Sequence, residues 1–133
     1  MGSLLDIGDD VANAPEPKAV PAGEEYKLRI ISAVQDLDKN QHPYLLPRFD
    51  IADQPLSKDF TKFLGLQHEE MDEKERARAR SNLRIFLECF GLPTSGQLDI
   101  EDMVGKTGWA ILGLEDNEQY GENNYVKKFI APK

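Results

Sequence analysis

The stretch EEMDEKERARARSNLRIFLECF, residues 69–90, decides the fold, because it carries the clearest helical pattern in the chain. Its first turn is acidic and its middle is basic, which suits the helix macrodipole. Gly91 and Pro93 follow it as a stop signal. The side chains expected to form its buried stripe are Ala79, Leu83, Phe86, Leu87 and Phe90. The pattern predicts one amphipathic helix.

Strand-like segments lie on both sides of this helix. Three precede it, at residues 25–34 (EYKLRIISAV), 43–53 and 57–64, with Pro47 expected at a sheet edge or a bulge. Two follow it, at residues 106–114 (KTGWAILGL) and 124–130 (NYVKKFI). Five short strands with a helix between the third and fourth is the order of the OB-fold, which commonly binds single strands of nucleic acid. The expected fold is therefore mainly β with one helix, a five-stranded OB-fold-like barrel that the helix plugs at one end.

The N-terminal segment differs from the rest in composition. Residues 1–24 contain three prolines and few apolar residues. Such a segment cannot bury enough surface to offset its ordering entropy. The prediction is an acidic flexible leader at residues 1–24 and a single-strand-binding domain at residues 25–133. The leader is either a solubilising segment or a short docking peptide for replication or recombination proteins.

The net charge of −8 argues on its face against a polyanion as partner. The charge is unevenly distributed, however. Residues 1–25 hold six acidic residues against one basic, a net −5, and residues 26–133 hold 18 acidic against 15 basic, a net −3. Because binding depends on the local field, a near-neutral body can still hold a basic groove.

Compartment is indicated by what the sequence lacks. Cys89 is the single cysteine, so no intrachain disulfide can form. No apolar run approaches the ~20 residues needed to span a bilayer, and the N-terminus shows no basic-then-apolar signal pattern. We expect no membrane association and a cytoplasmic protein. The sequence leaves open whether the protein forms a homo-oligomer.

Two local patterns resemble ligand-binding loops but lack residues that those loops require. Residues 105–107 (GKT) look like the end of a phosphate loop, but Ile100 stands where that loop needs glycine, and a strand follows instead of a helix. Asp36, Asp38 and Asn40 copy the start of a calcium loop, but Gln41 and Pro47 replace its required glycine and glutamate. The second pattern is better read as a hairpin turn.

Catalytic and metal sites are not indicated. His42 and His68 have no further ligand at zinc-binding spacing. Cys89 lies beside the apolar stripe and is expected to be a core residue, since nothing nominates a base that would activate it. We therefore expect no enzyme, no cofactor and no metal.

The remaining signal is basic residues interleaved with aromatic ones along the strand-like segments. Single-strand binders use this mixture, because aromatic rings stack on bases while Lys and Arg follow the phosphates. Any one of these aromatics is more often a core residue, but the segment order independently predicts a binding face. The candidate nucleic-acid-binding residues are Lys27, Arg29, Tyr44, Arg48, Phe60, Lys62, Trp109, Tyr125, Lys127 and Lys128.

Four segments carry a family resemblance. VPAGEEYKLRIISAV, PYLLPRFDIADQP, DIEDMVGKTGWAIL and NYVKKFIAP resemble a family of small bacteriophage proteins with an acidic N-terminal leader, long catalogued as a domain of unknown function. The resemblance covers residues 4–131. It implies an OB-like fold and a role beside phage replication or recombination genes, with no catalytic residues to transfer. Many phage single-strand binders end in an acidic tail, whereas this chain ends KKFIAPK, so a recruiting peptide is expected at the N-terminus.

The expected function is sequence-independent binding of single-stranded DNA during phage replication or recombination. The groove is expected to be formed by the second and third strands together with the loops at residues 36–42 and 115–123. The alternative is a protein-interaction module that uses an OB-like barrel to dock a replication or host protein, which the acidic balance favours.

Overall fold

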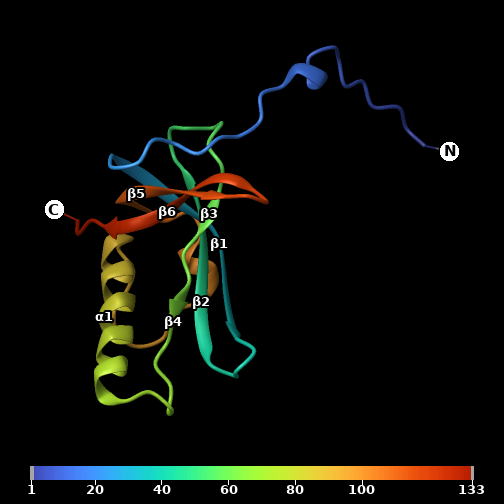
Figure 1. Ribbon diagram of the computed structural model, residues 1–133. Helices are drawn as coiled ribbons and strands as arrows, with labels where there is room; N and C mark the ends of the chain where they lie inside the picture. The colour runs from blue at the N-terminus through green and yellow to red at the C-terminus, as the bar shows by residue number, and fades with distance from the viewer. Residues whose placement is uncertain (1, 133) are drawn as a thin grey trace.

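The computed structural model describes residues 2–132 and consists of one antiparallel sheet with one long helix (Figure 1). The strands run in the order β3-β2-β1-β5-β6, and β4 also pairs with β2. The mainly β architecture with one helix is therefore confirmed. The strands are β1 (Glu25–Leu37), β2 (Pro43–Ile51), β3 (Phe60–Thr61), β4 (Leu64–Gly65), β5 (Thr107–Asn117) and β6 (Gly121–Phe129).

The sheet has six strands, so the predicted count of five is wrong. The third predicted strand is split into β3 and β4, with Lys62 and Phe63 between them. The break lies beside Pro47 of β2, whose carbonyl oxygen accepts a hydrogen bond from the Lys62 N–H at 3.2 Å. Since a proline has no N–H to return, the ladder on this side of β2 cannot continue through that position.

The two edges of the sheet do not join. Within residues 2–132, no strand ladder joins β3 or β4 to β6, so the sheet is not closed into a barrel. In Figure 1, β4 lies between α1 (Glu73–Cys89) and the long β1–β2 hairpin, and β6 crosses above the helix. Strands β3 and β6 approach each other without pairing, and a gap remains between residues 62–65 and β6.

A short N-terminal strap bridges this gap at one end. The Lys18 N–H donates to the Leu56 carbonyl oxygen, and the Lys18 carbonyl oxygen accepts from the Lys58 N–H. Val20, which is buried, bonds the buried side chain of Asn124 on β6 through both its N–H and its carbonyl. We call Lys18–Val20 the strap. Part of the predicted leader, the strap, is thus bonded to the sheet, and residues 2–17 extend from the body (Figure 1).

Helix α1 begins at Glu73, later than the predicted residue 69, because Asp72 caps it. The Asp72 side chain accepts from the Glu75 N–H, and the Glu75 side chain accepts from the Asp72 N–H, which makes a capping box. The predicted stripe is confirmed, since Leu83 is partly buried in the core and its four other members are buried. Phe86 is fully buried, and Phe90 stacks on Phe49 of β2 at 5.5 Å.

Two shorter helices complete the secondary structure. They are the 3-10 turns η1 (Val11–Asn13) in the extended segment and η2 (Ile100–Met103) before β5. Among the described residues, no helix has the length and apolar character needed to cross a bilayer.

Candidate nucleic-acid interface

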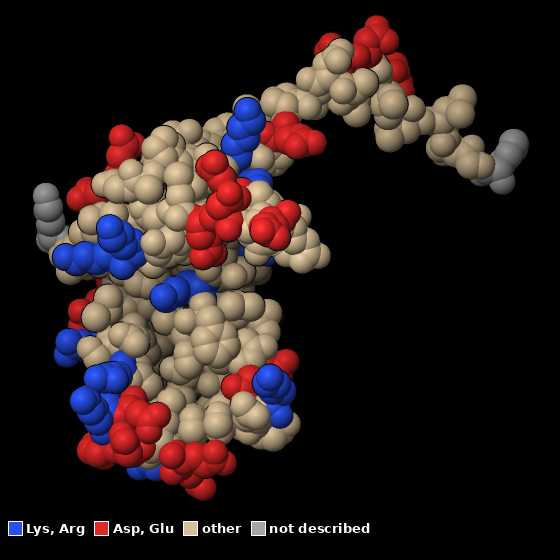
Figure 2. Space-filling view, in the orientation of Figure 1, with Lys and Arg blue, Asp and Glu red and all other residues tan. Residues whose placement is uncertain are grey.

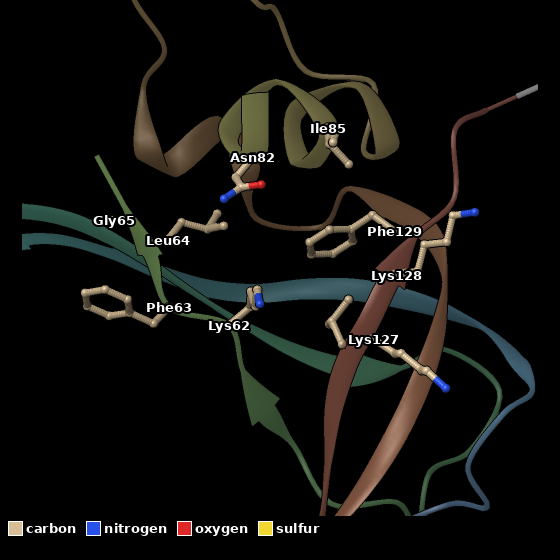
Figure 3. Close-up of a pocket in the computed structure, with 10 residues that line it drawn as sticks. Lys62, Phe63, Leu64, Gly65, Asn82, Ile85, Lys127, Lys128 and Phe129 are labelled. Carbon is tan, nitrogen blue, oxygen red and sulfur yellow. The ribbon is translucent and has the colours of Figure 1, made fainter. Parts of the chain in front are cut away.

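The gap between the β3–β4 segment and β6 forms a groove of about 330 Å³, which we call the seam. Residues 62–65 line one bank and residues 126–129 line the other, while Asn82 and Ile85 of α1 close it on the helix side. Figure 3 shows Leu64, Ile85 and Phe129 facing the space between the helix and the strands. The floor of the seam is therefore apolar.

Three predicted binding residues, Lys62, Lys127 and Lys128, line the seam, and in Figure 3 the side chains of Lys127 and Lys128 point outward from it in different directions. Each owes its position to an irregularity in the sheet. Lys62 lies in the break between β3 and β4, and a register shift between Ile111 and Leu112 leaves Lys127 as a bulged residue on β6. Because of this bulge, Lys127 and Lys128 are both exposed, where regular alternation would turn one of them inward.

The electrostatics of the seam favour an anion. No carboxylate side chain is among its lining residues, and none of its three lysines forms an ion pair with any residue of the range 2–132. Figure 2 shows a mainly tan surface in the middle of this face, with blue side chains at its margin and red ones gathered above and below it. A low-dielectric floor with unpaired cations concentrates positive potential at this place.

Exposed aromatic rings lie on both sides of the sheet gap, Phe63 in the lining of the seam and Tyr125 in that of a second groove. Phe63, which is 56% exposed, stacks on Tyr44 of β2 with ring centroids 5.1 Å apart. Tyr125 of β6 is 40% exposed and lies flat on β5, since a Cβ on Gly113 would come within 2.3 Å of its ring. Both rings offer faces on which a base can stack.

A second groove, of about 750 Å³, lies toward the β5–β6 hairpin, and we call it the hairpin groove. Arg48, Lys58 and Tyr125 line it, but Asp59 and Glu115 do too. Arg48 pairs with Asp59 at 3.6 Å. Carboxylates therefore offset part of its positive charge, which makes it a weaker phosphate site than the seam.

Three of the predicted residues do not present the groups that a nucleic acid would need. Phe60 is 6% exposed and packs on Phe49, so it offers no face for stacking, and its place in the predicted set is corrected to the core. The Arg29 guanidinium donates from Nε and Nη2 to the two carboxylate oxygens of Asp50, so the pair is bidentate. Arg48 has its partner in Asp59.

Lys27 and Trp109 lie together but away from the seam. They are opposite each other on β1 and β5, and Trp109 is 48% exposed. Trp109 lines a different hollow with Gly108 and Cys89. A Cβ on Gly108 would come within 2.7 Å of the Cys89 carbonyl oxygen, so this glycine permits the end of α1 to approach β5.

Cys89 itself is buried, as predicted. Its thiol donates to the Trp109 carbonyl oxygen at 3.3 Å, and burial raises the pKa of the thiol. A raised pKa lowers the thiolate fraction at neutral pH, which suits a core residue.

The loop at residues 36–42, predicted to take part in the groove, lines neither the seam nor the hairpin groove. Its Asp38 side chain accepts from the N–H groups of Asn40 and His42, and these bonds lower the pKa of that carboxyl. His42 stacks on His68 with ring centroids 3.8 Å apart and contacts Glu70 at 3.0 Å. The hairpin turn predicted here is confirmed, and it leans on the segment before α1.

Sequence reasoning missed several residues that shape the site. Lys58 donates to the carbonyl oxygens of Tyr120 and Glu122 and so holds the β5–β6 hairpin in place. Tyr120 is 65% exposed and lines the hairpin groove. An aromatic residue within the polar stretch NEQYGENN was a usable signal, whereas the role of Lys58 depends on a contact 62 residues away.

A scan against protein-family models finds no family that matches this chain, and a search of curated proteins finds no match either. The resemblance to small phage proteins accordingly stays a prediction.

Proposed function

We propose that the protein binds single-stranded DNA without sequence preference, with the seam as its phosphate track. The observation that carries this proposal is that Lys62, Lys127 and Lys128 all lie along one groove that no carboxylate lines. Lysines of this kind follow a phosphate backbone without reading bases. The stacked pair of Phe63 and Tyr44 supplies aromatic faces beside the seam, and Tyr125 supplies another in the hairpin groove.

We further propose that the sheet is an OB-like barrel left open along the seam. Strand β1 pairs with both β2 and β5, and α1 falls between the β3–β4 segment and β5, which supports this view. The strap takes the place of the closing strand pair at one end. Together with the resemblance to phage proteins, this arrangement supports a role in phage DNA replication or recombination.

The proposal is tested by fluorescence anisotropy with a labelled oligo-dT at low ionic strength. Lys62→Gln, Lys127→Gln and Lys128→Gln should each weaken binding about tenfold, since a charge-assisted hydrogen bond contributes about 1.5 kcal/mol. Lys39→Gln and Lys74→Gln are matched controls, because both lysines are exposed and lie outside the grooves. Equal losses for seam and control variants would contradict the assignment of the seam.

If oligo-dT does not bind at all, the protein-interaction module takes the place of this proposal. The charge on the N-terminal segment favours that second candidate.

A further inference from the structure

The extended segment, residues 2–17, mixes exposed apolar side chains with carboxylates. The side chains of Leu4 and Leu5 are almost fully exposed to solvent. Asp6, Asp9 and Asp10 alternate with these and with Ile7 in the run SLLDIGDDV. Acidic residues alone would serve solubility, and large aliphatic side chains exposed beside them work against it. Their combination indicates a segment that binds a surface which is both basic and apolar.

We propose that the N-terminal segment of one copy docks in the seam of a second copy. The seam has the complementary chemistry, with an apolar floor at Leu64 and Phe129 and unpaired cations at its rim. The outer edge of β6 carries no strand within the described residues, so its backbone groups can pair with an extended peptide. Leu4 and Leu5 would enter the floor, and the aspartates would meet the lysines.

A second copy is favoured over the same chain by the way the segment leaves the body. The strap fixes the chain at Lys18, and Pro15 and Pro17 precede it. Proline holds the residue before it extended, and Ala14 has φ −62° and ψ 135°. The segment leaves as an arm directed away from its own sheet (Figure 1). A neighbouring molecule is reached without reversing that arm.

This docking does not require that the seam binds DNA, but its consequence for regulation rests on the proposed function. If the seam is also the phosphate track, the arm of one molecule and a single strand compete for the same lysines. Self-association should then be released by oligo-dT and by salt.

The test is zero-length carbodiimide cross-linking of the intact protein, in an equal mixture of ¹⁴N- and ¹⁵N-labelled chains. The reagent joins a carboxylate to an amine only where the two are in contact. Mass spectrometry should find Asp6, Asp9 or Asp10 joined to Lys62, Lys127 or Lys128, with the two peptides carrying different isotopes in about half of the pairs, as random mixing dictates for an intermolecular contact. Links confined to peptides of one isotope would refute the second copy as the partner.

A double variant, Leu4→Ser with Leu5→Ser, separates docking from charge attraction, since it keeps every carboxylate and lysine. It should lower the yield of seam cross-links about tenfold or more, because the apolar contacts are lost. An unchanged yield, or equal links to Lys39 and Lys74, would overturn the proposal. Oligo-dT affinity of the intact protein is measured in parallel. Binding of oligo-dT without seam cross-links would reject the docking while leaving the proposed function standing.

Discussion

The strap offers a sharp test of the fold, because one buried side chain carries it. Asn124 makes three hydrogen bonds: it accepts from the Val20 N–H at 2.8 Å and donates to the carbonyl oxygens of Val20 at 2.9 Å and Gly113 at 3.1 Å. Its side-chain amide thereby reproduces the pairing that a strand would offer. We expect Asn124→Ala to detach the strap.

The magnitude follows from these bonds. Three hydrogen bonds at about 1 kcal/mol each give about 3 kcal/mol. If the strap leaves the sheet instead and its polar groups reach water, the buried side chain of Val20 is exposed, at about 1.5 kcal/mol. A loss of about 1.5–3 kcal/mol in the free energy of unfolding lowers the melting temperature by about 6–12 °C, at about 4 °C per kcal/mol for a domain of this size.

The assay is thermal unfolding followed by circular dichroism, with Asn123→Ala as the matched control. Asn123 is the preceding residue on the same strand, and its side chain donates only to the Gly121 carbonyl. Hydrogen exchange should also quicken at the Val20 amide in the Asn124 variant. Melting temperatures within about 2 °C of each other for the two variants would refute the strap as a stabilising element.

Three further predictions concern the core, the N-terminal segment and the first hairpin. Phe86→Ala should cost about 3–5 kcal/mol in chemical denaturation, since the ring is fully buried against Phe90 and Phe129; a smaller loss than that of an exposed-residue control such as Ile85→Ala would contradict the core assignment. Removing residues 2–16 should leave the melting temperature within a few degrees and oligo-dT binding equal or tighter, because the carboxylates of this segment compete with phosphates for the lysines. Removing residues 2–24 should destabilise the protein, because the strap is lost. Weaker DNA binding after the shorter deletion would show that the segment belongs to the site. Hydrogen bonds lower the Asp38 pKa in the folded state, so the contribution of this carboxylate to stability is present above the unfolded pKa of about 3.9 and is lost as pH falls through the lower folded value. The melting temperature of Asp38→Asn should lie below that of the parent at pH 7 and approach it below about pH 4. A difference in melting temperature that does not change with pH would rule this linkage out.

Much of the fold followed from local sequence, and the exceptions have physical causes. The helix and its stripe were predictable because Ala79, Phe86 and Leu87 recur at helical spacing and are buried. Its start was placed too early, although Asp72 and Glu75 form a capping-box pattern that could have corrected it. The split of the third strand depends on which neighbour Pro47 faces, and that is set by sheet pairing and not by local pattern.

The site was predictable in part for a similar reason. Lys62, Lys127 and Lys128 were named from their alternation with aromatic residues, and the structure places all three along the lining of the seam. The ion pairs that occupy Arg29 and Arg48 could not be foreseen, because their partners Asp50 and Asp59 lie far away in the sequence. The strap joins residues 104 positions apart, Val20 and Asn124, and no local signal marks such a contact.

The central claim, that three seam lysines hold a single strand by its phosphates, is tested most directly by the salt dependence of oligo-dT binding. Three phosphate contacts release about 0.7 counterions each, so log K should fall with log salt at a slope of about −2. The double variant Lys127→Gln with Lys128→Gln leaves one contact and should reduce the slope to about −0.7. A parent slope near zero, or the same slope in parent and double variant, would contradict the claim.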